Sequence, residues 1–199
     1  RLPGEICLSV SPYAKDVPVW MQSMRAQGHE FLLDLPTQTM NFPMTDPGPE
    51  ALMTNIMPEE NAVRLQKVMA SSTGYVGFTI PNDEVFFESD KDFVEPVVKE
   101  LASRGLMAVF TKTQERTEFT KLIKEEKLAN IVSDIHIRYG ADINEIVQRF
   151  SAAESISIKR GSVLLVIEAS PIALEELKKW VSNLNSKGFQ LAPVSVLAR

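Results

Sequence analysis

Three acidic side chains follow short apolar runs in the sequence and are the first candidates for chemistry. Asp34, Asp134 and Glu168 each stand at or just beyond the end of a run rich in Val, Ile and Leu. The carboxyl ends of parallel strands meet at one edge of a sheet, where ligand sites are usually built. Carboxylates gathered there can act as general acid or base, or can bind a hard cation. These three residues are therefore the catalytic candidates, with solvated strand ends as the competing interpretation.

The chain has two histidines, which limits the metal sites it can build. A site of three histidines is excluded, and a site of two would need both His29 and His136. His136 follows Asp134 by two residues, so these two side chains are the better placed pair, although a solvated loop explains them as well. Asn82, in a Pro-Asn-Asp-Glu stretch, suits a turn as readily as a sugar. The common phosphate-loop, dinucleotide, zinc-protease and serine-hydrolase motifs are absent.

Short apolar runs alternate with amphipathic segments along the whole chain, which predicts strands joined by helices. The runs are continuously apolar, as in parallel strands covered on both faces. The strand-to-strand period of about 25 to 30 residues is the size of one βα unit. The predicted strands are Glu5–Val10, Phe31–Leu35, Tyr75–Thr79, Leu106–Phe110, Asn130–Ser133, Val163–Ile167 and Gln190–Val194. The predicted helices are Val17–Ala26, Pro58–Ala70, Asp90–Arg104, Glu115–Lys127, Ile143–Ile158 and Pro171–Lys187.

This pattern predicts a single α/β domain over residues 1–199, either a (β/α) barrel or an open doubly wound sheet. Seven strands do not suit a closed barrel. An incomplete barrel is therefore expected, with one βα unit missing, distorted or supplied from elsewhere. The long connection 36–57 and Pro58 together carry five of the twelve prolines. Such a loop either forms part of a site or is a proline-stiffened segment that only packs.

Composition excludes several classes of protein. The 199 residues include 21 Lys+Arg, 26 Asp+Glu and 44% hydrophobic residues, which is typical of a globular domain and not of a disordered tail or a nucleic-acid-binding protein with a basic face. The apolar runs are too short to span a membrane. Cys7, the single cysteine, lies in an apolar run and is expected to be an inert core thiol.

Several local strings occur in the order and spacing of one known family. Through them the chain resembles, over essentially its whole length, the divergent polysaccharide deacetylase family, a branch of the distorted βα-barrel superfamily that includes chitin and peptidoglycan deacetylases. The strings are Ser11-Pro12-Tyr13-Ala14, Gly28-His29-Glu30, Phe31 to Pro36, Asp46-Pro47-Gly48-Pro49, Asn61, Arg64-Leu65, Gly74-Tyr75-Val76-Gly77, Arg104-Gly105-Leu106 and Pro193 to Leu197.

The resemblance implies a distorted, incomplete (β/α) barrel of mostly parallel strands, whose first βα unit, with a strand ending in Asp-Asp, would precede Arg1. It also implies a site that has lost ligands. Pro81 stands where the family commonly has a histidine, Gln38 where it has a carboxylate and Phe110 where it has an aspartate. A Gly-His-Pro-like turn is replaced by Glu168-Ala169-Ser170-Pro171. Asp134 matches a family aspartate.

We therefore expect a deacetylase-like domain with a degenerate metal site and no cofactor, which binds a glycan or peptidoglycan-related polymer, or a protein partner that acts on one. Family resemblance places it in the periplasm or cell envelope. The expected substrate-binding residues are Asp46, Tyr75, Asn82 and His136.

Two alternatives stay open. One is an active metal-dependent deacetylase or amidase that uses Asp34, Asp134, His136 and Glu168 with upstream carboxylates and a divalent metal. The other is an assembly subunit whose barrel gap is filled by a neighbouring chain or by self-association.

Overall fold

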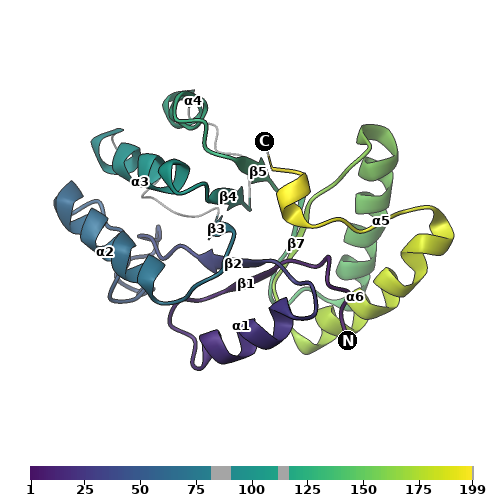
Figure 1. The fold of residues 1–199 in the computed structure, drawn as a ribbon. Helices are drawn as coiled ribbons and strands as arrows, with labels where there is room; N and C mark the ends of the chain where they lie inside the picture. The colour runs from purple at the N-terminus through teal and green to yellow at the C-terminus, as the bar shows by residue number, and fades with distance from the viewer. Residues whose placement is uncertain (82–90, 112–116, 199) are drawn as a thin grey trace.

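Strands and helices alternate along the chain in the computed structural model, which describes residues 1–81, 91–111 and 117–198 (Figure 1). The strands are β1 (Leu8–Val10), β2 (Phe31–Asp34), β3 (Gly77–Ile80), β4 (Met107–Phe110), β5 (Asn130–Val132), β6 (Ile135–Ile137) and β7 (Leu165–Ile167). The helices are α1 (Val17–Arg25), α2 (Pro58–Ala70), α3 (Lys91–Ser103), α4 (Thr117–Glu125), α5 (Ile143–Arg160) and α6 (Pro171–Leu184), followed by the 3₁₀ turns η2 (Asn185–Lys187) and η3 (Val194–Val196).

The strands form an open, distorted barrel. A five-stranded parallel sheet has the order β1-β2-β3-β4-β5, and β6 and β7 form a second, two-stranded parallel sheet. Among the described residues β1 pairs with β2 alone and β7 with β6 alone, so the ring is not closed between β7 and β1. The predicted α/β class and incomplete barrel are confirmed.

The chain changes its pairing partner between β5 and β6. The amide of Ser133 still donates to the Phe110 carbonyl on the β4 side (2.8 Å), whereas the amide of Asp134 donates to the Leu164 carbonyl beside β7 (2.9 Å). The prediction placed a strand over Asn130–Ser133 and missed β6, because the polar Asp134 and His136 interrupt the apolar run.

The predicted strand Gln190–Val194 is wrong. This segment joins no sheet, and it leads into the 3₁₀ turn η3. Val194 is buried beside Leu32, Met107 and Val109, and the Ser195 amide donates to the Glu30 carboxylate (3.1 Å) just before β2. The C-terminal segment is apolar because it covers the amino ends of the strands, not because it is a strand.

The strands bury their side chains in two directions. Leu33, Phe78, Ala108 and Phe110 belong to the large core shared with α2, α3 and α4, which lie along one side of the sheet (Figure 1). A separate core joins β6 and β7 to α5 and α6. Residues on the other face of β1 to β4 point into the barrel, where they are available to line a site.

Local signals explain where the helices start and stop. Pro58 opens α2, and Glu59 and Glu60 occupy its first turn, where negative charge is favourable. Asp142 caps α5 by accepting from the Glu145 amide (2.8 Å), and Ser170 caps α6 by accepting from the Ala173 amide (3.1 Å). These caps fix the helices at the carboxyl ends of β6 and β7.

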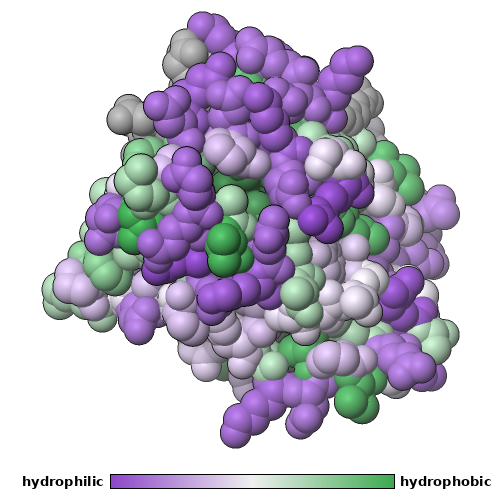
Figure 2. All heavy atoms as spheres, turned by 60° about the vertical axis from the view of Figure 1, so that its left-hand side comes forward, coloured by the Kyte–Doolittle hydropathy of each residue, from purple (hydrophilic) through white to green (hydrophobic). Residues whose placement is uncertain are grey.

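The side of the molecule that carries α2 and α3 is mostly hydrophilic, with apolar residues as isolated spots (Figure 2). In the part of the chain that the structure describes, no helix is both long and apolar enough to cross a bilayer.

Candidate functional site

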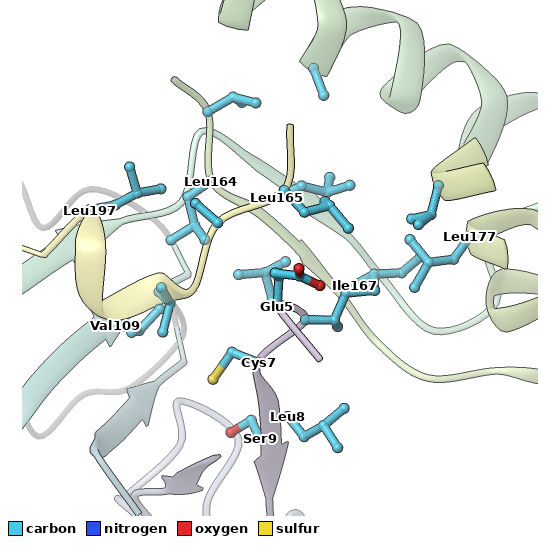
Figure 3. A pocket seen from close by; sticks show the side chains of 18 of the residues that line it. Glu5, Cys7, Leu8, Ser9, Val109, Leu164, Leu165, Ile167, Leu177 and Leu197 are labelled. Carbon is cyan, nitrogen blue, oxygen red and sulfur yellow. The ribbon is translucent and has the colours of Figure 1, made fainter. Parts of the chain in front are cut away.

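A cavity of about 780 Å³ opens between β1 and β7 and extends into the barrel. Its apolar walls come from both edge strands, from Val109 of β4 and from Leu197 near the C-terminus (Figure 3). Polar side chains line it where β1 to β4, β6 and β7 end: Ser9, Asp34, Thr79, Thr111, His136 and Glu168. The cavity therefore has an apolar part and a polar part, as small-ligand sites usually do.

Three side chains from adjacent strands form a hydrogen-bonded cluster in the polar part. The Ser9 hydroxyl donates to Asp34 Oδ1 (2.5 Å), and its oxygen lies 2.6 Å from Thr79 Oγ1. Asp34 and Thr79 are direct partners in the β2–β3 ladder, which fixes their distance. Burial raises the pKa of the Asp34 carboxyl, and the hydrogen bond from Ser9 opposes that effect. The cluster offers hydroxyl groups and a carboxyl to a polar ligand.

The raised pKa of Asp34 predicts a pH-dependent stability. The folded protein binds the Asp34 proton more tightly than the unfolded chain does, so the free energy of unfolding falls as pH rises from about 4, the ordinary aspartate value, through the folded pKa. Asp34→Asn cannot ionise and is expected to gain stability relative to the wild type as pH rises. Urea unfolding of both proteins between about pH 4 and pH 8 measures this, and a stability difference that is constant with pH contradicts it.

His136 and Glu168 form a second polar pair at the carboxyl ends of β6 and β7. His136 Nε2 lies 3.0 Å from Glu168 Oε1, and Glu168 Oε2 accepts a hydrogen bond from the Tyr139 amide (2.7 Å). Both residues line the cavity. Glu168 follows β7 as predicted, whereas His136 lies inside β6, which the sequence did not predict, so the pairing of the two residues depends on the β6–β7 ladder.

Asp134 lies apart from the cavity lining. Its carboxylate accepts from Arg160 Nη1 (2.8 Å) at the end of α5 and from the Leu164 amide (2.9 Å) before β7. Because both oxygens are engaged by groups that fix the start of the β6–β7 sheet, we interpret Asp134 as a structural residue.

Asp134→Ala is therefore expected to lower the free energy of unfolding by about 1 to 2 kcal/mol, because the Leu164 amide loses its acceptor. Ligand binding in the cavity is expected to stay unchanged. Urea unfolding measures the first effect and ligand titration the second. Arg160→Gln is the control for the exposed ion pair, with an expected loss below about 0.5 kcal/mol. Loss of ligand binding in well-folded Asp134→Ala would contradict this assignment.

The remaining candidates lie elsewhere. The Asp46 carboxylate accepts from the Gly48 amide (2.8 Å) and shapes a turn in the long loop. The Tyr75 hydroxyl donates to the Met69 carbonyl (3.2 Å), and its ring packs edge-on against Phe78. Neither residue lines the cavity. Asn82 is outside the described residues.

The long loop 36–57 is held by packing and hydrogen bonds. Leu52 is fully buried, and its backbone pairs with Pro36 and Gln38 (2.9 and 2.8 Å). The Tyr13 hydroxyl accepts from the Glu50 amide (3.1 Å). No residue of this loop lines the cavity, which favours the packing role over the site role.

Sequence reasoning missed the hydroxyl groups of the site. Ser9 and Thr79 each stand between two apolar neighbours on a strand, and Thr111 directly follows β4; these polar residues at inward-facing positions were the available signal. Thr111 is 7% exposed, and within the described part of the chain its Oγ1 has no hydrogen-bond partner. Thr111 itself lines the cavity.

Taken together, the structure is an open (β/α) barrel of parallel strands with a polar cluster and a cavity at the carboxyl ends of the strands, the end where such barrels usually bind ligands. A family model, divergent polysaccharide deacetylase, matches residues 1–198. The chain belongs to the divergent polysaccharide deacetylase family.

A solved structure has the same fold. The crystal structure of the uncharacterized protein ATU2773 from Agrobacterium tumefaciens C58 has a TM-score of 0.90 and 25% sequence identity. The alignment covers 98% of this chain and 79% of that one. None of the curated proteins compared with the chain matches it.

The described residues do not fit the metal ion that a deacetylase of this superfamily implies. A zinc-class ion needs about three protein ligands and an open position. Among residues 1–81, 91–111 and 117–198, no three His, Cys, Asp or Glu side chains are grouped so that they could hold a metal. Asp34 instead accepts a hydrogen bond from Ser9, and His136 Nε2 lies 3.0 Å from Glu168 Oε1. No metal-dependent step is assigned to these residues.

Proposed function

We propose that the domain binds an N-acetylated glycan of the bacterial envelope, such as a chitin-like or peptidoglycan-derived polymer, without hydrolysing it efficiently. Membership of the family supports a carbohydrate-related role. The observation that carries the proposal is the Ser9–Asp34–Thr79 cluster, which presents hydroxyl and carboxyl groups to a cavity at the carboxyl ends of the strands. Such groups recognise sugar hydroxyls and acetamido groups by hydrogen bonding.

Thr111 and Asp34 explain why a polar ligand is favoured. Thr111 lines the same cavity and adds a further polar residue to its wall. Asp34, whose pKa is raised by burial, donates a hydrogen bond when protonated and accepts when ionised. The apolar lining from Val109 and Leu197 can cover the less polar face of a sugar ring.

Calorimetric titration with an N-acetylglucosamine tetramer and with soluble peptidoglycan fragments tests the proposal. Thr79→Val keeps the side-chain shape, removes the hydroxyl and is expected to weaken binding about fivefold to tenfold, the equivalent of about 1 kcal/mol. The matched control is Thr45→Val in the loop that does not line the cavity, and its affinity is expected to equal that of the wild type. Absence of saturable binding of either glycan overturns the proposal.

The His136–Glu168 pair favours one second candidate, an active hydrolase. A carboxylate-oriented imidazole can act as a general base. This function predicts acetate release from the same tetramer, lost in His136→Gln. Acetate release that depends on His136 would replace glycan binding as the function of the site.

A further inference from the structure

The turn that follows β6 carries an exposed aromatic ring close to the polar part of the cavity. Tyr139 is 70% exposed, whereas the other exposed aromatic residues in the described part of the chain, Tyr13 and Phe42, are 42% and 40% exposed. A single exposed ring is common on protein surfaces. The rigidity of the backbone at Tyr139 and its distance from the site therefore decide whether the ring has a role.

The backbone on both sides of Tyr139 is held in place. The Ala141 amide donates to the Arg138 carbonyl (3.2 Å), which closes a tight turn. Gly140 is the third residue of this turn and has a φ of +90°, the left-handed conformation that a type II turn requires at that position. Asp142 then caps α5. Tyr139 therefore stands at the corner of an ordered turn between β6 and α5.

A carboxylate of the cavity fixes the position of Tyr139. Glu168 Oε2 accepts a hydrogen bond from the Tyr139 amide (2.7 Å), and Glu168 Oε1 lies 3.0 Å from His136 Nε2. Glu168 and His136 line the cavity, whereas Tyr139 does not. Tyr139 therefore lies at the rim of the polar part, outside the cavity itself.

An aromatic ring at this rim suits the apolar face of a sugar. In a β-linked N-acetylglucosamine unit the ring substituents are equatorial, so both faces of the sugar present C–H groups, which pack well on an aromatic ring. Tyrosine makes this contact at a small entropic cost, because its side chain has few rotatable bonds and its backbone is already ordered. A glycan that fills the polar part and continues past the rim would meet Tyr139.

We propose that Tyr139 is a stacking platform for a second sugar unit of the glycan whose first unit contacts the Ser9–Asp34–Thr79 cluster. The inference rests on the proposed glycan-binding function. It adds that the site selects a chain of at least two sugar units over a single sugar, because a single sugar in the polar part leaves the Tyr139 ring uncovered.

Titration of the full chain with the N-acetylglucosamine tetramer tests the platform. Tyr139→Ala is expected to bind the tetramer about fivefold to tenfold more weakly than the wild type. Tyr139→Phe is expected to bind within about twofold of the wild type, because stacking needs the ring and not the hydroxyl. Phe42→Ala, in the loop that does not line the cavity, is the matched control and is expected to bind as the wild type does. Equal tetramer affinity of Tyr139→Ala and wild type overturns the inference.

A second titration with the N-acetylglucosamine monomer separates stacking from a general disturbance of the site. Tyr139→Ala is expected to leave the NMR-monitored affinity for the monomer unchanged, so that the preference of the protein for the tetramer falls. If Tyr139→Ala weakens the monomer and the tetramer by the same factor, the residue only supports the polar cluster, and the inference is wrong. Failure of the wild type to bind the tetramer has a different meaning, because it removes the proposed glycan function and the platform together.

Discussion

Replacing Gly77 by alanine is expected to destabilise the protein by about 3 kcal/mol, the upper end of the usual cost of overpacking a core. A Cβ at this position would lie 2.1 Å from the Met107 carbonyl oxygen and 2.5 Å from its Cγ. Gly77 pairs directly with Met107 in the β3–β4 ladder, so backbone must move to relieve the contact. The displacement would reach Thr79, two residues further on, and with it the polar cluster. Urea unfolding and glycan titration measure both effects.

Gly105→Ala separates the steric effect at Gly77 from the general cost of replacing glycine. Gly105 has a φ of +67°, and nothing lies within 4 Å of a Cβ built there. Its replacement is expected to cost only about 1 kcal/mol of backbone strain and to leave glycan affinity unchanged. If the two variants lose the same stability, the close β3–β4 approach is not the cause.

Asn61→Leu is also expected to have a large effect and to lower the free energy of unfolding by about 3 kcal/mol. Asn61 is 1% exposed, and its side chain accepts from the Met53 amide (2.9 Å) and donates to the Met53 carbonyl (2.8 Å). Leucine leaves both buried backbone groups without partners, each at about 1 to 3 kcal/mol. Because these two bonds fix the end of the long loop to α2, hydrogen exchange is expected to accelerate over residues 36–57 before the rest of the chain.

Asn183→Leu is the matched control for Asn61. Its amide donates to the Lys179 carbonyl (2.9 Å) on the exposed surface of α6, where water can replace it. We expect Asn183→Leu to lower the free energy of unfolding by less than about 0.5 kcal/mol and to leave hydrogen exchange over residues 36–57 unchanged. Uniform acceleration of exchange in Asn61→Leu would show that the loop and the core unfold together, contrary to this account.

For the part of the chain that the structure describes, the sequence was sufficient to predict all six α-helices and six of the seven strands. Continuous apolar runs such as Phe31–Leu35 have one stable environment, the interior of a parallel sheet. The helix starts at Pro58 and Pro171 were predicted correctly, because proline in the first helical turn is a local signal. The C-terminal segment was mispredicted as a strand because an apolar run that covers a barrel end has the same composition as one that joins the sheet.

The site was less predictable, because it depends on contacts between distant segments. Asp34 ends β2 and Glu168 directly follows β7, as predicted, whereas His136 lies within β6 and not beyond a strand; all three line the cavity. The partners of Asp34 depend on how the strands are paired. Ser9 and Thr79 lie close to Asp34 only because β1, β2 and β3 align side by side. Asp134 has the same sequence signature as Asp34, but the change of pairing partner after β5 turns it toward Arg160. Nothing local distinguishes these two aspartates.

The most direct test of the account combines binding and turnover in one sample. The full chain, supplied with Zn²⁺, is titrated with the N-acetylglucosamine tetramer while released acetate is measured. We expect saturable binding, weakened in Thr79→Val, with acetate at the level of a protein-free control. Zn²⁺-dependent acetate release that disappears in Asp34→Asn would contradict a polar cluster that binds glycan without holding a metal.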